Sequence, residues 1–203
     1  MVKRNGASAV SEIEAPEFTV RTVCATVRGT QLSWSREIDA CPKKGDYQQH
    51  EEQNWRSRLH IQNEEIVIPV MALKIAMQEA AKGMGIPGKG KATYAQPFKA
   101  GVTPLAEFVG TGVKAADATP EWRFVPSNPS NNKPGQGGRV HKCFPLIQSW
   151  TATVEFHVFD DQITEGVFHQ ILTRAGMMIG VGRFRPANGG FYGRFSVENI
   201  EWK

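Results

Sequence analysis

Two segments with helical periodicity lie among segments with the composition of β-strands, and their order is what most constrains the fold of this chain. Residues 68–83 carry apolar side chains three and four positions apart, with Pro69 in the first turn and Gly83 at the end, which predicts a helix. Residues 164–175 repeat this spacing and are followed by Gly176, which predicts a second helix that ends there. Alternating or β-branched composition predicts strands at 18–32, 103–109, 122–125, 140–147, 151–158 and 191–202.

This order of elements predicts an α+β fold. It follows the βαββαβ order of a ferredoxin-like or RRM-like domain, in which two helices cover one face of a four-stranded antiparallel sheet. A chain of 203 residues with 40% apolar content can bury one substantial core. We therefore expect a single domain over residues 1–203. Its other expected parts are a flexible N-terminus at 1–16, a long insertion after the first strand at 33–63, a mobile loop at 126–138 and a glycine-rich loop near the C-terminus.

The basic residues are segregated from the acidic ones. Three windows, residues 80–106, 122–154 and 166–197, contain no Asp or Glu and hold 12 of the 24 Lys and Arg residues. The rest of the chain has the other 12 Lys and Arg against all 20 Asp and Glu, a net charge of −8. Basic residues without compensating acids form a positive surface, whose usual partner is a polyanion. Solvated loops that merely lack acids are the alternative.

The third window contains the segment GVGRFRPANGGFYGRF, residues 180–195, which has five glycines and no acidic residue. Glycines allow a backbone to turn sharply and to approach a ligand closely. Arg183, Arg185 and Arg194 can bind phosphates through their planar guanidinium groups, and Tyr192 offers a face on which a base can stack. We expect these residues to bind a nucleic-acid backbone. A hairpin with its aromatic residues in the core is the alternative.

The first window contains a second candidate segment, GKGKATYAQPFK, which interleaves Lys89, Lys91 and Lys99 with Tyr94. Alternating phosphate-binding and base-stacking side chains are typical of a groove for a single strand. Burial of the aromatic residue under the loop is the alternative. The remaining window adds Arg139 and Lys142 to the expected nucleic-acid-binding set.

The glycine-rich segment after the second helix resembles the signature of the RAMP superfamily, which includes the backbone subunits of CRISPR effector complexes. Gly180-Val181-Gly182 matches the first half of that signature, whereas Gly190-Phe191-Tyr192-Gly193 has one residue too many for the second half. The segment VIPVMALKIAMQEAAK is similar to the first helix of the family. The resemblance implies single-stranded DNA or RNA bound along a homo-oligomer or filament. It extends to stand-alone proteins encoded by tailed phages.

The insertion mixes aromatic and charged residues, a pattern more typical of a subunit contact than of a phosphate track. We expect Tyr47, Trp55, Arg56 and Arg58 to contact a neighbouring copy. The protein is then expected to assemble side by side along a single strand through sequence-independent backbone contacts. A protein-interaction subunit whose basic surface matters little is one alternative.

An endoribonuclease is the other alternative, because some RAMP relatives use a histidine as general base. His141 lies beside Arg139 and Lys142, but the spacing positions no second catalytic group. We therefore expect a binding protein without catalytic residues.

Neither a metal, a cofactor nor a membrane is expected. The three cysteines form no CxxC pair, and the HKC triplet is too sparse to bind a metal. No segment approaches the roughly 18 apolar residues of a membrane span, and the N-terminus lacks the apolar core of a secretion signal. These features predict a cytoplasmic protein.

Overall fold

The computed structural model describes residues 19–42, 45–126 and 138–203. Four strands of this described part form an antiparallel sheet in the order β10-β1-β9-β5, which we call the central sheet. Their bounds are Arg21–Gly29 for β1, Val102–Pro104 for β5, Trp150–Val158 for β9 and Phe195–Trp202 for β10.

Alternation of side chains in the inner strands gives the central sheet one apolar face. Val23, Ala25 and Val27 of β1 are fully buried. Side chains between them point to the other face, where the hydroxyl groups of Thr26 and Thr153 lie 2.9 Å apart. The apolar face must therefore be covered by other elements.

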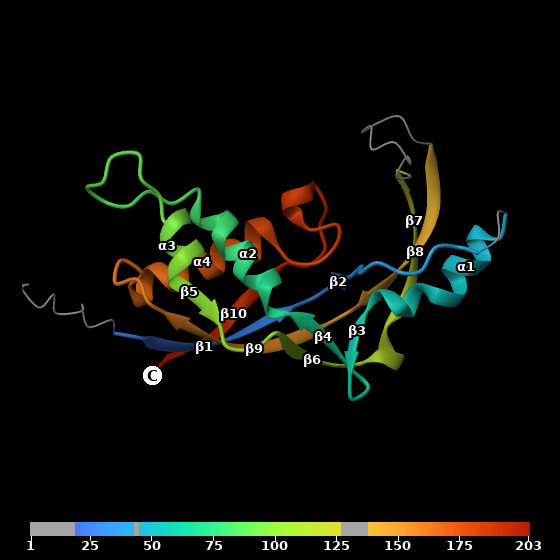
Figure 1. Cartoon of the computed structure of the whole chain (residues 1–203), viewed down its shortest axis with the longest axis horizontal. Helices are drawn as coiled ribbons and strands as arrows, with labels where there is room; N and C mark the ends of the chain where they lie inside the picture. The colour runs from blue at the N-terminus through green and yellow to red at the C-terminus, as the bar shows by residue number, and fades with distance from the viewer. Residues whose placement is uncertain (1–18, 43–44, 127–137) are drawn as a thin grey trace, which may run out of the picture.

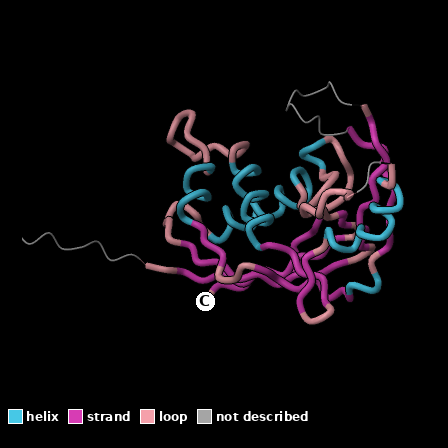
Figure 2. The backbone as a smooth tube through the Cα atoms, turned by 45° about the vertical axis from the view of Figure 1, so that its right-hand side comes forward, coloured by secondary structure: helices cyan, strands magenta, loops and turns pink. Residues whose placement is uncertain are grey.

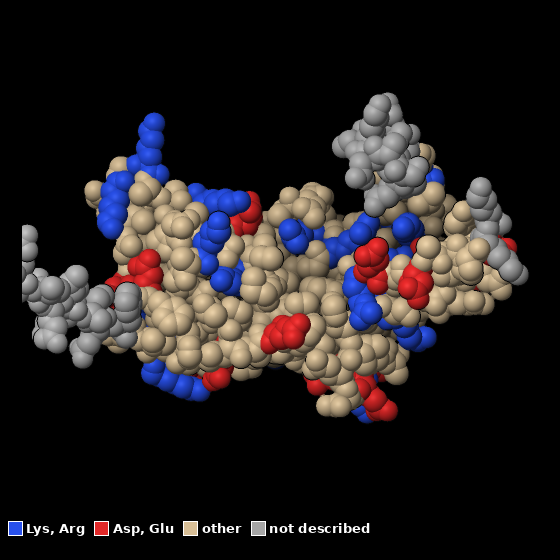
Figure 3. Space-filling view, in the orientation of Figure 1, with Lys and Arg blue, Asp and Glu red and all other residues tan. Residues whose placement is uncertain are grey.

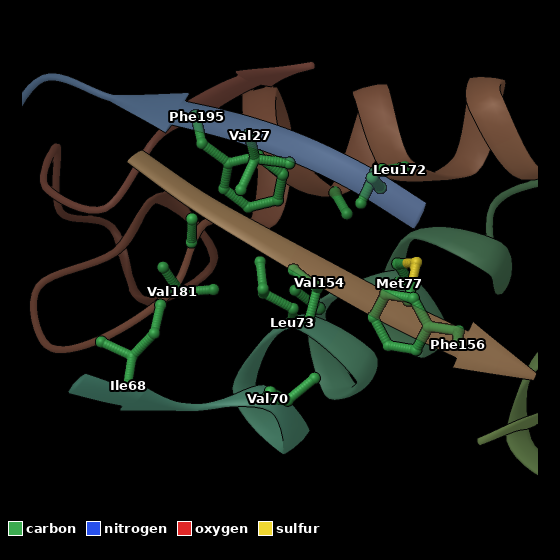
Figure 4. Packing of buried hydrophobic residues seen from close by; sticks show 14 of the residues in the cluster. Val27, Ile68, Val70, Leu73, Met77, Val154, Phe156, Leu172, Val181 and Phe195 are labelled. Carbon is green, nitrogen blue, oxygen red and sulfur yellow. The ribbon is translucent and has the colours of Figure 1, made fainter. Parts of the chain in front are cut away.

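Three helices, α2, α3 and α4, cover this face (Figure 1). Leu73 and Met77 of α2 and Leu172 of α4 pack against β1 and β9 in the core (Figure 4). Thr164 caps α4, because its hydroxyl accepts a hydrogen bond from the amide of Val167 at 3.3 Å. The bounds are Val70–Ala81 for α2, Ala95–Gly101 for α3 and Glu165–Arg174 for α4.

The sequence predicts that the helix α4 ends before Gly176, but the helical turns continue past this residue. The chain continues as a π-helix, η3 (Ala175–Ile179), and turns at Gly180 with a φ of 69°. Gly176 lies inside this π-helix. A Cβ at this position would collide with the carbonyl oxygen of Phe195 in β10, so a glycine is required there. Close packing against the sheet, rather than helix termination, explains this glycine.

Two smaller antiparallel sheets, β2-β8-β7 and β3-β4-β6, lie at one end of the central sheet. The β7–β8 hairpin rises away from the central sheet, while the strands together form a layer beneath the helices (Figures 1 and 2). The bounds are Leu32–Ser33 for β2, His60–Gln62 for β3, Glu65–Pro69 for β4, Phe108–Lys114 for β6, Thr119–Pro126 for β7 and Arg139–Ile147 for β8.

The expected insertion at 33–63 is largely ordered into elements. It contains the helix α1 (Tyr47–Asn54), the 3-10 helix η1 (Trp55–Arg58) and the strand β3. Trp55 and Leu59 join the hydrophobic core. The expected flexible N-terminus and almost all of the expected mobile loop lie outside the described residues.

The α+β class with antiparallel sheets is confirmed, but several strand boundaries differ from those predicted. The segment 103–109 contains parts of β5 and β6, which belong to different sheets. The segment 18–32 reaches past the end of β1 into β2. β10 begins only at residue 195, because residues 191–194 belong to a loop. Among the described helices, none is both long and apolar enough to cross a membrane.

Candidate nucleic-acid interface

The glycine-rich loop, residues 180–194, is held against the chain next to β2. The amide of Gly193 donates a hydrogen bond to the carbonyl of Gln31 at 2.7 Å, and the amide of Arg183 donates one to the carbonyl of Ser33 at 2.7 Å. The amide of Val181 closes the loop by donating to the carbonyl of Gly193 at 2.9 Å. The loop is therefore anchored by its own backbone.

The glycines of this loop allow close approach between backbone segments of the protein itself. A Cβ at Gly193, where φ is 73°, would collide with the carbonyl oxygen of Val181. A Cβ at Gly190 would collide with the carbonyl oxygen of Phe184. The sequence pattern suggests that these glycines let a ligand approach the backbone closely. In the structure they instead let segments of the protein backbone approach each other.

Arg183 carries a partly buried charge without a compensating anion. Its guanidinium carbon lies 4.4 Å from the ring centre of Phe144 and 5.0 Å from that of Phe184. Burial, and to a lesser degree the nearby charge of Arg58, lower the pKa of Arg183 below its ordinary value. No carboxylate of the described chain pairs with Arg183 or Arg185, and the Nε atoms of both are buried without a hydrogen-bond partner there. An anionic ligand would supply what both groups lack.

Arg58, by contrast, is buried and fully compensated. Its Nη2 lies 2.8 and 2.7 Å from the two carboxylate oxygens of Glu51, and its Nε donates to the carbonyl of Cys143 at 3.1 Å. Arg58 therefore links η1 to α1 and β8 within one chain. This burial does not fit its expected role as a contact to a neighbouring copy.

A groove of about 450 Å³ lies between the start of α2 and the glycine-rich loop. Met71 and Ile75 of α2 contribute apolar side chains that remain 43% and 48% exposed. The loop contributes Arg183 and Arg185. No side chain caps the first turn of α2, and the amide of Val70 donates to the carbonyl of Glu107 at 2.9 Å. The other lining residues are Trp34, Ser35, Pro69, Ala72, Gly182 and Asn188.

Tyr192 is buried and links the glycine-rich loop to β7, so its face is not open for base stacking. Its hydroxyl donates a hydrogen bond to Glu121 and accepts one from Arg123 at 2.5 Å. Burial, followed by the contact with Glu121, raises the pKa of Tyr192. The exposed aromatic side chain of this loop is Phe191, which is 58% exposed and packs beside Tyr192.

Arg194 lies outside the groove. Its Nε donates to the carbonyl of Met177 in the π-helix at 3.1 Å, and its side chain is exposed. The three arginines of the glycine-rich loop therefore do not share one site, because only Arg183 and Arg185 line the groove.

The lysines of the first basic window are exposed, but the tyrosine among them is not. Lys89 lies in the loop between α2 and α3, where it donates to Gln162 at 2.6 Å, and Lys91 and Lys99 are exposed. Tyr94 is only 6% exposed and belongs to the hydrophobic core. Burial, rather than base stacking, is the role of Tyr94.

The basic segments occupy successive positions along the longest axis of the protein. The loop between α2 and α3 lies at the left of Figure 1, the glycine-rich loop near the middle and the β7–β8 hairpin at the right. Lys and Arg side chains gather along the upper part of this view (Figure 3). Arg139 and Lys142 lie on β8, where Arg139 stacks 5.7 Å from the ring centre of Phe124. These segments are therefore brought into a row, not into one pocket.

The expected subunit-contact residues divide into exposed and buried pairs. Tyr47 is 57% exposed, and Arg56 is exposed with its guanidinium carbon 4.3 Å from the ring centre of Trp55. Trp55 is only 6% exposed and, like Arg58, is packed inside the chain. Of these four residues, Tyr47 and Arg56 are the ones exposed to a partner.

Eight of the ten groove residues are absent from the set that the sequence predicts, and the four with the largest side chains among them are Trp34, Met71, Ile75 and Asn188. The sequence carried a signal for two of these four. Met71 and Ile75 are large apolar residues on the outward face of the helix, where polar residues are usual. Trp34 and Asn188 give no such signal, because only folding brings them to the same groove.

Comparisons with known proteins find similar structures but no related sequences. Neither models of protein families nor curated proteins match this chain. Cmr-beta of Type III-B, solved bound to cognate target RNA, is similar over 90% of this chain at 12% identity with a TM-score of 0.49. This chain spans 60% of the length of that protein.

Two further solved structures are similar at comparable levels. Cmr6 from Pyrococcus furiosus is 11% identical over 89% of this chain and 100% of its own, with a TM-score of 0.47. A chain of a CRISPR RNA-guided surveillance complex is 13% identical over 90% of this chain and 68% of its own, with a TM-score of 0.41. All three structures are at most 13% identical to this chain, with TM-scores below 0.5. We assign no role to any residue of this chain on the basis of these structures.

Proposed function

We propose that this protein binds single-stranded DNA or RNA through sequence-independent contacts to the backbone, and that copies assemble side by side along the strand. In this proposal it has no catalytic residues and needs no cofactor. We also propose that the central sheet with α2 and α4 is a ferredoxin-like unit, because β1, α2, β5, β9, α4 and β10 follow one another in that order.

The observation that carries the proposal is the pair of uncompensated guanidinium groups at the groove. Arg183 and Arg185 have no anion among the described residues, although both are partly buried. A protein that keeps such charges incurs a desolvation cost, which a phosphate would offset through charge-assisted hydrogen bonds.

The row of basic segments supports a long polyanion rather than a small anion. Lys89 and Lys91 at one end, the groove in the middle and Lys142 at the other end lie on segments that follow the longest axis of the protein (Figure 1). A flexible single strand can follow such a row, because its backbone can bend between charged sites. Repetition of this row in neighbouring copies would extend the track.

Reversal of both groove charges tests the proposal. R183E/R185E should lower affinity for a single strand by well over tenfold, since each lost charge-assisted hydrogen bond is worth about 1.5–3 kcal/mol. The slope of log affinity against log salt should also decrease by about 1.4, at about 0.7 for each lost phosphate contact. Gel shift or fluorescence anisotropy across a salt series measures both quantities.

R28E/K114E is the matched control, because it makes the same change in net charge at exposed residues of β1 and β6 outside the three basic windows. It should leave the salt slope nearly unchanged. Normal binding by a folded R183E/R185E protein, or tighter binding to a duplex than to a single strand, would count against the proposal.

An endoribonuclease is a second candidate, because folding supplies a second titratable group beside His141. His50 and His141 line one cavity of about 690 Å³ together with Lys142. Two imidazoles can serve as base and acid when a 2′-hydroxyl attacks the adjacent phosphorus and the 5′-oxygen leaves. The binding reaction, followed over time with RNA, tests this candidate. Cleavage that H141A abolishes would favour it, and intact RNA after prolonged incubation would exclude it.

A further inference from the structure

We propose that the groove between α2 and the glycine-rich loop seats one nucleobase of the bound strand, with an adjacent phosphate on Arg183 and Arg185. This inference rests on the proposed function and deepens it. It adds a sequence-tolerant base contact to the contacts with the backbone.

The apolar wall of the groove is the first observation. Leu73 and Met77 of α2 are buried in the core, as their helical spacing requires. Met71 and Ile75, one turn apart, instead face outward and remain 43% and 48% exposed. Within the described chain no element covers them, and they line the groove. An apolar ligand surface would remove them from water.

Trp34 places an aromatic ring at the same groove, and the ring is held by its surroundings. A Cβ at Gly182, where φ is 74°, would collide with the carbonyl oxygen of Ser33 and would lie 3.2 Å from Cε3 of Trp34, so this glycine lets the loop pass close to the ring. The imidazole of His60 packs at the edge of the ring, with the ring centres 6.1 Å apart. An aromatic ring held in this way is suited to contact a base.

The chemistry of the groove matches that of a nucleotide. The groove places apolar side chains of α2 beside two guanidinium groups that lack an anion. A nucleotide has a flat base with apolar faces, joined through a sugar to a phosphate, so it can satisfy both at once. The volume of about 450 Å³ lies within the range of about 300–1,000 Å³ that is common for small-ligand sites. Since bases in a duplex are paired and stacked, only a single strand can place a base there.

Binding to a single strand that lacks bases distinguishes the base contact from the contacts with phosphates. We would compare the affinity of the protein for a single strand with its affinity for an abasic strand of the same length and charge. Wild-type protein should bind the base-bearing strand about tenfold more tightly, a typical contribution of one contacted base. Both strands should show the same salt slope, because their phosphates are identical.

The variant M71S/I75S should remove most of this preference while its salt slope stays that of the wild type. I61S/M178S is the matched control, because Ile61 and Met178 are 45% and 57% exposed and do not line the groove. It should keep the tenfold preference. All four positions lie at the surface, and thermal unfolding of each variant confirms that the fold is intact.

The outcomes separate the inference from the proposed function. Equal affinity of the wild type for both strands would overturn the base contact and leave the backbone contacts standing. If M71S/I75S keeps the preference for the base-bearing strand, the base lies outside the groove and the inference is wrong. Absence of binding to either strand would overturn both. Displacement of the strand by an acidic peptide with apolar side chains, but not by mononucleotides, would assign the groove to a peptide and overturn the inference.

Discussion

Arg58 and Arg183 show at the scale of single residues how two arginines beside the same aromatic ring can have opposite roles. Their guanidinium carbons lie 5.1 and 4.4 Å from the ring centre of the same residue, Phe144. Glu51 neutralises Arg58, whereas no carboxylate of the described residues reaches Arg183. The first arginine stabilises the fold, and the second is open to a ligand. Arg58 lies outside the three basic windows, and Arg183 lies within the third.

His60 makes the stability of the protein depend on pH. Burial, and then the charge of Arg36, lower the pKa of His60 below its ordinary value of 6.5, while Glu107 opposes this shift. The unfolded chain therefore binds this proton more readily than the folded protein does. The contribution of neutral His60 is present above pH 6.5 and is lost as the pH falls through the lowered pKa. Thermal unfolding between pH 7 and pH 5 should show this loss.

The variant H60Q should flatten this pH dependence, because glutamine does not titrate. His169 lies exposed on α4, so H169Q is the matched control and should leave the pH profile unchanged. An identical profile for H60Q and the wild type would mean that other groups cause the loss of stability.

The glycine-rich loop shows, at the scale of an element, that a glycine pattern can serve packing rather than binding. Gly189 and Gly193 have nearly the same φ, 75° and 73°, but differ in their surroundings. A Cβ at Gly189 meets no atom within 4 Å, whereas a Cβ at Gly193 collides with the carbonyl of Val181. G189A should lower the free energy of unfolding by about 1 kcal/mol, the cost of a left-handed residue. G193A should lower it by about 3 kcal/mol or more.

Chemical denaturation of both variants measures this difference, and each serves as the control for the other because the backbone cost is shared. G193A should also weaken binding, since Arg183 depends on the closed loop for its position. Equal destabilisation by the two substitutions would mean that the loop adapts to a side chain at Gly193.

At the scale of the whole molecule, the exposed part of α1 and η1 is the candidate contact between copies. Tyr47 and Arg56 are exposed at the end of the protein that lies opposite the loop between α2 and α3 (Figure 1). Y47S/R56E should weaken binding to long strands by about tenfold, because side chains at the centre of an interface often contribute 1–2 kcal/mol or so. Affinity for a strand that holds one copy should remain unchanged. Titrations with short and long strands measure the two effects.

The control for this experiment is I61S/K114E, which makes a similar change at exposed residues of β3 and β6. W55A is unsuitable, because Trp55 is in the core and its loss would destabilise the fold by about 3–5 kcal/mol. Equal weakening on short and long strands would assign Tyr47 and Arg56 to the nucleic-acid surface.

The sequence by itself determined the elements whose signals are local. Hydrophobic periodicity of period 3.6 indicated α2 and α4, and alternation of period 2 indicated β1 and β9. These signals depend only on which face of an element must be buried, so they are present before any partner is known. The separation of basic from acidic residues is also a property of the sequence alone.

Only the tertiary structure decided which side chains reach the surface and which charges are compensated. Tyr94, Tyr192 and Trp55 are of residue types common in ligand sites, but the fold buries all three. Met71 and Arg183 meet at one groove although more than a hundred residues separate them. Burial and pairing are long-range properties, because an aromatic ring or a guanidinium group is recognised by its neighbours in space. For this reason the sequence predicted the basic glycine-rich segment, and only the fold showed that Arg183 and Arg185 are the arginines of this segment that line the groove.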